Sequence, residues 1–439
     1  MEDPDRPGDH ACPHTLVTSI PDGIHKHKHT HNVNRWIEAK LTTMSTVSRR
    51  GLLGYAGATG VGAAAGFAGG WAVKPVSAAE RHQVLNQRYS PHGVHQPGIL
   101  TPTAAANQLV ALDLLPATDA AALGRLMRSW TGLIEALMEG RPTAGDTLPD
   151  LAQEAVSMSV LVGYGTGVFA LPGLEAKRPA GFQDVPPMAH DELDERWNGG
   201  DLLLWVSADD GTSVDYAVRR LVADAAPFAR RRWTQTGSWR GFDGEGKAVT
   251  GRNLFGQVDG SGNPDGEQLD AALWSTDDWL AGGTQLVVRR IEMNLDTWDE
   301  LTRDRQESAI GRNLAVGAPL TGEAEADDLD LAATEDGVPV IALDAHARRS
   351  HPDANNGRRM LRRGVNYTHE EWNDGEPHAT AGLIFCAFQA SIADQFIPVQ
   401  RALDDTDALN EWTTAIGSAV FAIPPGYAKG GWVGETLLA

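Results

Sequence analysis

Strand-like and helix-like segments follow one another in the same order twice along this chain, and this repetition constrains the fold most strongly. In the first series, residues 119–140 carry apolar side chains at the three- and four-residue spacing of an amphipathic helix. A second helix is expected near residues 214–226. Short apolar runs predict strands at residues 109–114, 159–165, 201–210 and 230–237. The predicted order is β-α-β-β-α-β.

The second series repeats this order after residue 280. Apolar runs predict strands at residues 284–295, 363–369, 382–391 and 419–426. A helix is expected over residues 297–312, with Thr297 as its N-cap and Glu300 at the capping-box position. Another helix is expected over residues 392–403.

Each series has the pattern of a split βαβ unit, which is ferredoxin-like, with an antiparallel sheet and helices on one face. The predicted fold class is therefore α+β, built from two such units. Two units also explain the length of 439 residues, because single hydrophobic cores stop growing at roughly 250–300 residues. We place the boundary near residue 245, which gives an N-terminal domain at 80–245 and a C-terminal domain at 246–439.

The segment before residue 80 has the pattern of an export signal. Arg49 and Arg50 precede a Gly/Ala-rich apolar run that ends at Val73, and small residues follow at 76–78. This pattern predicts a twin-arginine signal peptide over residues 44–79, and its many glycines disfavour a permanent membrane span. Residues 1–43 are then a disordered upstream extension. The mature protein is expected outside the cytoplasm, either extracellular or in the periplasm or cell envelope.

Charge and cysteine content narrow the function classes. A formal net charge of −21 argues against nucleic-acid partners, because binding to phosphates needs a basic surface. Cys12 precedes the signal, so the mature chain keeps one thiol, Cys386, and no disulfide. Cys386 lies in the apolar run "GLIFCAF" and is predicted to be a small buried side chain rather than a nucleophile. Export of a folded chain without disulfides is typical of a protein that receives a cofactor in the cytoplasm.

One acidic residue, Asp259, lies between glycines in the stretch "GQVDGSGNPDG". Residues 259–270 have oxygen-bearing side chains at several positions used by calcium loops, and an acid at the twelfth. Pro264, however, occupies the sixth position, where the sharp turn of such a loop needs glycine. A calcium site and a surface turn rich in Gly, Asn and Asp both stay open at this point.

A second group of polar residues follows the apolar run at 338–345. His346 comes directly after this run and is well placed to project from its end as a metal ligand. His351 and the pair Arg362-Arg363 follow. Taken alone, a histidine in such a position is more often solvent-facing or part of the core than a metal ligand, and paired arginines usually lie on a solvated face.

Several separated motifs occur together in one order. Gly256-Gln257-Val258-Asp259-Gly260 matches a GxxDG motif, a histidine is followed by Arg348 and Pro352, and Leu361-Arg362-Arg363-Gly364 matches an arginine motif. In this combination the chain resembles the dye-decolorizing peroxidase family of haem enzymes, from about residue 90 to the C-terminus.

The resemblance implies that haem b, iron protoporphyrin IX, binds in the C-terminal half. It implies that His346 is the proximal iron ligand, with His351 as its rival. Other residues are implied to lie at the haem: Gly260, Ser261 and Gly262 with His351 against its edge, and Asp259 and Arg362 on its open face.

Cleavage of hydrogen peroxide explains why an acid and a cation are needed together. A carboxylate such as Asp259 can take a proton from one peroxide oxygen and return it to the other. The fixed guanidinium of Arg362 can stabilise the negative charge that develops as the bond breaks. Phe385 and Phe388 are candidates for the wall of this pocket, with ordinary core packing as the alternative.

The sequence therefore predicts an exported haem peroxidase that reduces hydrogen peroxide and oxidises dyes or phenolic aromatic compounds. The alternative is a deferrochelatase-like protein of an iron-uptake system, which releases iron from haem. A haem carrier without catalysis is weaker, because storage needs neither Asp259 nor Arg362. A homo-oligomer stays open.

Overall fold

The computed structural model describes residues 87–439, apart from residues 144, 155, 244, 246 and 374–375. They lie within one compact unit, Lys74–Ala439. The predicted upstream extension and signal peptide lie outside the described residues. Within the described ranges, no helix has both the length and the apolar character needed to cross a membrane.

The first series forms the elements that the sequence predicts. Helices α4 (Ala120–Met138) and α6 (Gly211–Ala225) begin after aspartates, because the carboxylates of Asp119 and Asp210 accept hydrogen bonds from free N–H groups of the first turn. A further short helix, α5 (Pro149–Glu154), was not predicted. The strands are β1 (Ala106–Leu114), β2 (Ser159–Tyr164), β3 (Leu202–Ala208) and β4 (Ala229–Ser238).

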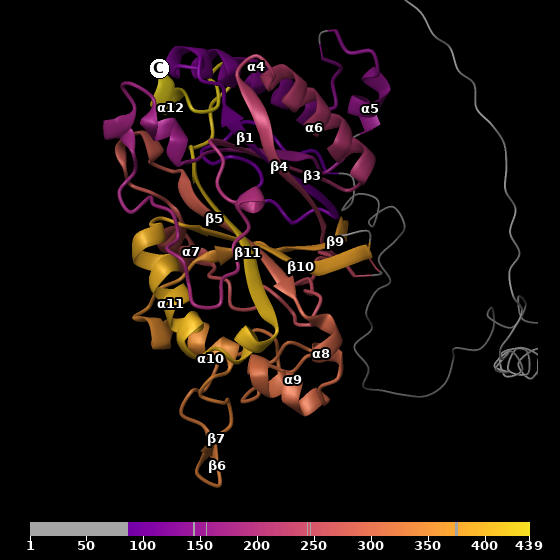
Figure 1. Cartoon of the computed structure of the whole chain (residues 1–439), viewed down its shortest axis with the longest axis vertical. Helices are drawn as coiled ribbons and strands as arrows, with labels where there is room; N and C mark the ends of the chain where they lie inside the picture. The colour runs from indigo at the N-terminus through magenta and orange to yellow at the C-terminus, as the bar shows by residue number, and fades with distance from the viewer. Residues whose placement is uncertain (1–86, 144, 155, 244, 246, 374–375) are drawn as a thin grey trace, which may run out of the picture. The chain divides into compact units, whose positions relative to one another are not determined.

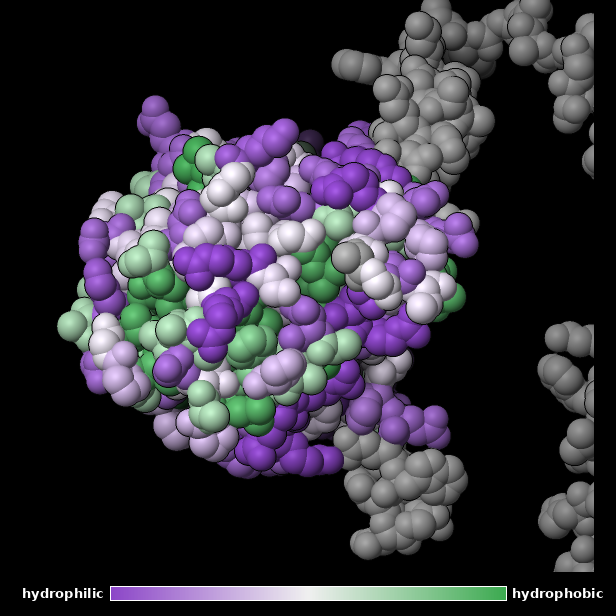
Figure 2. Space-filling model, turned by 90° about the horizontal axis from the view of Figure 1, so that it is seen from above, coloured by the Kyte–Doolittle hydropathy of each residue, from purple (hydrophilic) through white to green (hydrophobic). Residues whose placement is uncertain are grey.

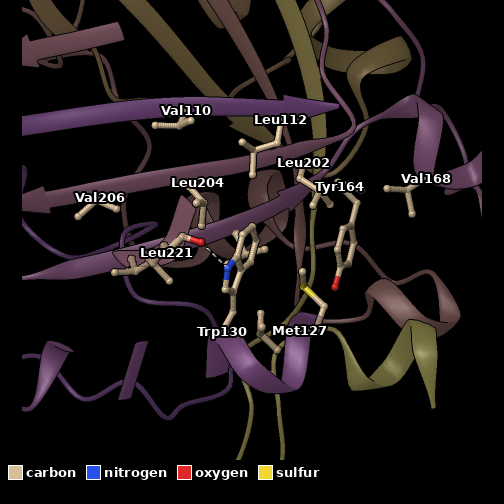
Figure 3. Packing of buried hydrophobic residues seen from close by; sticks show 14 of the residues in the cluster. Val110, Leu112, Met127, Trp130, Tyr164, Val168, Leu202, Leu204, Val206 and Leu221 are labelled. Carbon is tan, nitrogen blue, oxygen red and sulfur yellow. Dashed lines mark hydrogen bonds between the residues drawn. The ribbon is translucent and has the colours of Figure 1, made fainter. Parts of the chain in front are cut away.

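The core of this half lies between the strands and the helices α4 and α6. Trp130 of α4 is fully buried, and its indole Nε1 donates a hydrogen bond to the carbonyl oxygen of Leu221 on α6, 3.0 Å away (Figure 3). Met127 of α4 and Leu204 of β3 lie beside it. The buried indole therefore packs against the sheet while its polar nitrogen is satisfied by the neighbouring helix.

The second series also forms, with one change in its first helix. The helix expected at 297–312 is two helices, α8 (Leu295–Asp299) and α9 (Arg303–Ile310). The predicted Thr297 cap is wrong: Asn294 caps α8 and Thr302 caps α9. The hydroxyl of Thr302 accepts a hydrogen bond from the amide of Arg305, which starts a new helix where one continuous helix was expected.

The later elements of the series follow the prediction more closely. The helix expected at 392–403 begins as a π-helical turn, Ile392–Phe396, and continues as α11 (Ile397–Thr406). α11 has a proline in its first turn, where the N–H group that proline lacks is not needed for a hydrogen bond within the helix. The strands are β5 (Thr284–Met293), β9 (Val365–Asn373), β10 (Glu376–Gln389) and β11 (Thr413–Ile423).

Two four-stranded antiparallel groups, β2-β3-β1-β4 and β9-β10-β5-β11, correspond to the two predicted sheets. They are joined edge to edge by the residue pairs Ala422–Tyr164 and Ser238–Asn366. Since each group meets the other at both edges, the eight strands pair in a closed ring, which the sequence did not predict. The predicted α+β class with ferredoxin-like units is confirmed.

The helices of the second series lie apart from those of the first, and several smaller elements lie outside both series. Helices α8, α9, α10 and α11 lie at the end of the molecule opposite α4, α5 and α6 (Figure 1). The remaining α-helices and strands of the described residues are α7 (Gly266–Leu273), β6 (Thr334–Glu335), β7 (Val338–Pro339), α10 (His346–Ser350), β8 (Leu361–Arg362) and α12 (Glu435–Leu438).

Cys386 lies on β10 and is fully buried, as predicted, and burial raises the pKa of its thiol. A thiol in such surroundings is not a nucleophile. On the surface, Figure 2 shows hydrophilic residues interspersed with smaller apolar groups over one face of the molecule. Scattered apolar groups of this kind are ordinary for a protein surface.

Candidate active site

Asp259, His346 and Arg362 line one cavity. They come from separate parts of the fold: Asp259 from the loop before α7, His346 from the first turn of α10, and Arg362 from β8. The structure thus brings Asp259 together with His346 and Arg362, which lie 87 and 103 residues later in the chain.

His346 is held by a carboxylate that sequence reasoning missed. Its Nδ1 lies 2.6 Å from Oδ2 of Asp407, which is the residue after α11 and is almost fully buried. The other oxygen of Asp407 accepts a hydrogen bond from the amide of Leu409, so the carboxylate is fixed on both sides. Burial lowers the pKa of His346, but the charge and hydrogen bond of Asp407 raise it more, and the net shift is upward.

This pairing leaves the other ring nitrogen of His346 available. With Nδ1 bonded to Asp407, Nε2 is the nitrogen free to bind a metal, and a carboxylate partner raises its basicity. Asp407 lies 61 residues after His346, in an acidic stretch at a helix end. No spacing rule connects the two positions, so the sequence carried no signal for this pair.

His351, the rival ligand, lies on the same cavity wall, but both of its ring nitrogens are engaged. Nε2 lies 3.0 Å from Oδ1 of Asp328, and Nδ1 accepts a hydrogen bond from the amide of Asp353. The hydrogen bond from His351 lowers the pKa of Asp328. His351 is therefore occupied as a link between two loops, whereas His346 keeps one nitrogen for a ligand.

Asp259 is held on a tight turn of the loop before α7. Its amide donates to the carbonyl oxygen of Gly251 at 2.9 Å, and its Oδ2 accepts from Nδ2 of Asn253 at 3.3 Å. Gly260 has a φ of +129°, a conformation that other residues rarely adopt. The next two residues, Ser261 and Gly262, also line the cavity, and the Ser261 hydroxyl donates to Glu325.

The two neighbouring arginines point to different places. Arg362 lines the cavity, whereas Arg363 is turned away and donates from Nη1 to the carbonyl oxygens of Ile99 and Thr101. Successive side chains of an extended segment point to opposite faces, which separates the pair. Of the pair, Arg362 is therefore the arginine that lines the cavity together with Asp259 and His346.

Comparison with known proteins settles the family. Residues 96–239 match the family model described as "Dyp-type peroxidase, N-terminal", and residues 250–428 match "Dyp-type peroxidase, C-terminal". The chain belongs to the Dyp-type peroxidase family.

Individual relatives agree with this assignment. A dye-decolorizing peroxidase of Thermobifida fusca is 37% identical over 430 residues, covering 89% of this chain and 97% of that protein. A deferrochelatase of Shigella flexneri is 32% identical over 425 residues, with the same coverage. The crystal structure of a DyP-type peroxidase from Cellulomonas bogoriensis has a TM-score of 0.76 and 45% identity, covering 81% of this chain and 99% of that chain.

Dyp-type peroxidases depend on haem, and the cavity residues suit this group. Apolar side chains line the cavity, and three arginines besides Arg362 lie at it as well, which matches a flat apolar macrocycle that carries carboxylates. The apolar residues are Leu329, Met360, Phe396, Val399 and Leu403, and the arginines are Arg312, Arg358 and Arg359. This Dyp-type peroxidase is therefore a haem-dependent oxidoreductase.

The calcium alternative for residues 259–270 has no support in the structure. The side chain of Asn263 is bonded to the backbone of Arg362, and Oδ1 of Asp270 accepts from the indole of Trp274. Residues 266–273 form α7 rather than the second half of a wrapped loop. Across the described ranges, no cluster of three or more His, Cys, Asp or Glu side chains is arranged to hold a metal ion.

The two phenylalanines of β10 have different surroundings. Phe385 lines the cavity, with its ring 6.3 Å from that of Phe396. Phe388 is fully buried on the other face of the strand and stacks on Trp205 at 6.1 Å. The prediction of a pocket wall agrees with the position of Phe385, whereas Phe388 belongs to the core.

Proposed function

We propose that this Dyp-type peroxidase binds haem b through His346, reduces hydrogen peroxide, and oxidises dyes or phenolic aromatic compounds. The observation that carries the proposal is the single cavity onto which His346, Asp259 and Arg362 open. A carrier would need the histidine alone. An acid and a cation on the same cavity supply the two functions that cleavage of a peroxide requires.

When bound, the haem iron supplies the position at which the O–O bond of a peroxide is broken. Asp407 holds the Nδ1 hydrogen of His346, so that Nε2 is presented as the iron ligand. Asp259 would take a proton from one oxygen of the peroxide at Oδ and return it to the other. Arg362 would stabilise the negative charge that develops as the O–O bond breaks, through the fixed donors of its guanidinium.

The test is an absorption spectrum of the purified holoprotein with and without hydrogen peroxide, together with the rate of dye bleaching. We expect Asp259→Ala and Arg362→Ala each to slow the reaction with peroxide by on the order of 10²-fold or more. If both variants bleach dye at the wild-type rate, the assigned roles are wrong. A Soret band that never shifts on peroxide addition would instead indicate a carrier.

A second candidate is release of iron from haem, because the chain is 32% identical to a deferrochelatase over most of its length. Anaerobic incubation with haem, followed by a search for free porphyrin fluorescence, tests it. Porphyrin fluorescence with no peroxide-dependent bleaching would favour this function over peroxidase activity. The absence of free porphyrin would exclude it.

We also propose that the protein is exported by the twin-arginine route, on the strength of Arg49 and Arg50 and the apolar run behind them. Replacement of both arginines by lysine should hold the folded protein in the cytoplasm, whereas lysine at Arg6 and Arg35 should not. Cell fractionation with a haem-absorbance readout measures this. Unchanged distribution of the double-lysine variant would contradict it.

A further inference from the structure

Asn263, four residues after Asp259, bonds to Arg362 at three points. Its Oδ1 accepts from the backbone amide of Arg362 at 3.0 Å and from Nε at 3.4 Å, and its Nδ2 donates to the backbone carbonyl of Arg362 at 2.9 Å. One side-chain amide therefore satisfies both backbone polar groups and one guanidinium nitrogen of the same residue.

The contact replaces a missing strand neighbour. Arg362 ends β8, a strand of two residues that pairs on one side with Phe388 and Ala387 of β10. The amide of Asn263 adds the donor and the acceptor that another strand would otherwise supply to Arg362. Arg362 is consequently fixed at its backbone as well as at its side chain.

Asn263 is itself held by the turn that carries Asp259. Its amide donates to the carbonyl oxygen of Gly260 at 2.9 Å, and the following residue, Pro264, is buried. The turn that carries Asp259 therefore also fixes Arg362 through Asn263, although about a hundred residues separate Asp259 from Arg362 in the chain.

The bond to Nε also determines which guanidinium atoms face the cavity. Within the described residues, no hydrogen bond engages Nη1 or Nη2 of Arg362. The guanidinium lies close to the turn, since a Cβ atom added to Gly262 would be in van der Waals contact with Nη2 at 3.6 Å. The two terminal nitrogens therefore remain free to donate to an anion in the cavity.

We infer that Asn263 is a positioning residue for Arg362. It directs the guanidinium toward the part of the cavity above the open face of the haem, and it sets the distance between the guanidinium and Asp259. This inference rests on the proposed function, because it assumes that Arg362 stabilises an anion there. Asn263 does not line the cavity and so touches neither substrate nor haem in the proposed role. It acts only through Arg362, and this makes the inference separable from a general structural role.

Fluoride binding to the ferric holoprotein is the test, since a small anion on the open face of haem accepts hydrogen bonds from Arg362 and no turnover is involved. We expect Asn263→Ala to raise the fluoride dissociation constant about 10-fold. This is the lower end of the loss that is typical when a residue holding a ligand-binding side chain is removed. The second-order rate constant with peroxide should fall similarly, with the KM for the reductant unchanged.

The matched control is Asn198→Ala. Asn198 is also partly buried, and its Oδ1 accepts from the backbone amide of Ser418 on β11 at 2.9 Å, away from the cavity. This variant loses a comparable link between a loop and a strand and should bind fluoride like the wild type. Equal losses in Asn198→Ala and Asn263→Ala would overturn the inference.

A double mutant separates positioning from general damage. If Asn263 acts only through Arg362, adding Asn263→Ala to Arg362→Ala causes no further loss, and a further loss overturns the inference. If Arg362→Ala alone leaves fluoride binding unchanged, the proposed role of Arg362 fails and the inference with it. Wild-type binding by Asn263→Ala beside weak binding by Arg362→Ala overturns the inference alone.

Asn263→Asp keeps the inference testable if Asn263→Ala does not fold or bind haem. It preserves the side-chain size and the acceptor for the Arg362 amide, but removes the donor to the Arg362 carbonyl. It also adds a negative charge beside Nε that competes for the guanidinium. Fluoride should bind at least about 10-fold more weakly, and wild-type affinity in this variant would overturn the inference.

Discussion

Nδ1 of His346 lies 2.6 Å from Oδ2 of Asp407, across 61 residues of sequence. The carboxylate is almost fully buried and is bonded on its other oxygen to the amide of Leu409. This fixed geometry orients the imidazole toward the cavity that it shares with Asp259 and Arg362.

Replacement of Asp407 by asparagine should weaken haem binding. The amide keeps the shape of the side chain but loses the charge that raises the pKa of His346 and the basicity of Nε2. We expect haem affinity to fall on the order of 10–100-fold, measured by titration of the haem-free protein. Asp405→Asn is the control, because Asp405 is mostly exposed and 3.9 Å from Arg349. Equal affinities of the two variants would contradict the prediction.

Gly260→Ala should strain the loop that carries Asp259. The φ of +129° disfavours any side chain, and the new Cβ would lie 3.2 Å from Cγ2 of Thr250. We expect the free energy of unfolding to fall by about 1–3 kcal/mol, measured by denaturant unfolding. Gly211→Ala should have no such cost, because its φ is ordinary and no atom lies within 4 Å of the added Cβ. Unchanged stability of Gly260→Ala would show that the loop relaxes freely.

Leucine at Phe388 and at Phe385 should give different defects. Phe388→Leu removes the stack on Trp205 in the core, so the free energy of unfolding should fall by about 1 kcal/mol while the haem spectrum stays unchanged. Phe385→Leu alters the cavity wall, so the haem spectrum should change more than the stability. Thermal unfolding and absorption spectra of both holoproteins measure this. The opposite pattern would reassign the two faces of β10.

Asp404→Asn should reduce stability in a pH-dependent way. Burial raises the pKa of Asp404, but hydrogen bonds from Ala189 and His190 lower it by a larger amount. The net pKa of Asp404 therefore lies below the ordinary 3.8. A carboxylate whose pKa is lowered by folding stabilises the fold at pH values above its pKa in the unfolded chain. This contribution is lost as the pH falls through the lowered pKa.

The free energy of unfolding of Asp404→Asn should therefore be lower than that of the wild type by about 1–3 kcal/mol at about pH 7. The difference should shrink only below the ordinary pKa of 3.8. Urea unfolding over a pH series measures it, with Asp405→Asn as the control for loss of one surface charge. A difference that grows on acidification would have the wrong sign.

Local patterns were enough to predict most of the elements. The spacing of apolar residues predicted α4 and the strands of both series, because burial on one face leaves a periodic signal in the sequence itself. The split of residues 297–312 into α8 and α9 was missed, because Asn294 and Thr302 are the caps instead of Thr297, and only the backbone path selects among such candidates.

The sequence by itself determined the family, the α+β class and the residue types of the candidate site. Each of the motifs around Asp259, His346 and Arg362 is a continuous stretch of sequence and can be read without the fold. The closed ring of strands was decided only by the tertiary structure, because single residue pairs join the two groups. The partners Asp407 and Asn263 were decided in the same way. Their hydrogen bonds depend on chain segments that meet only after folding, and no local periodicity records such a meeting.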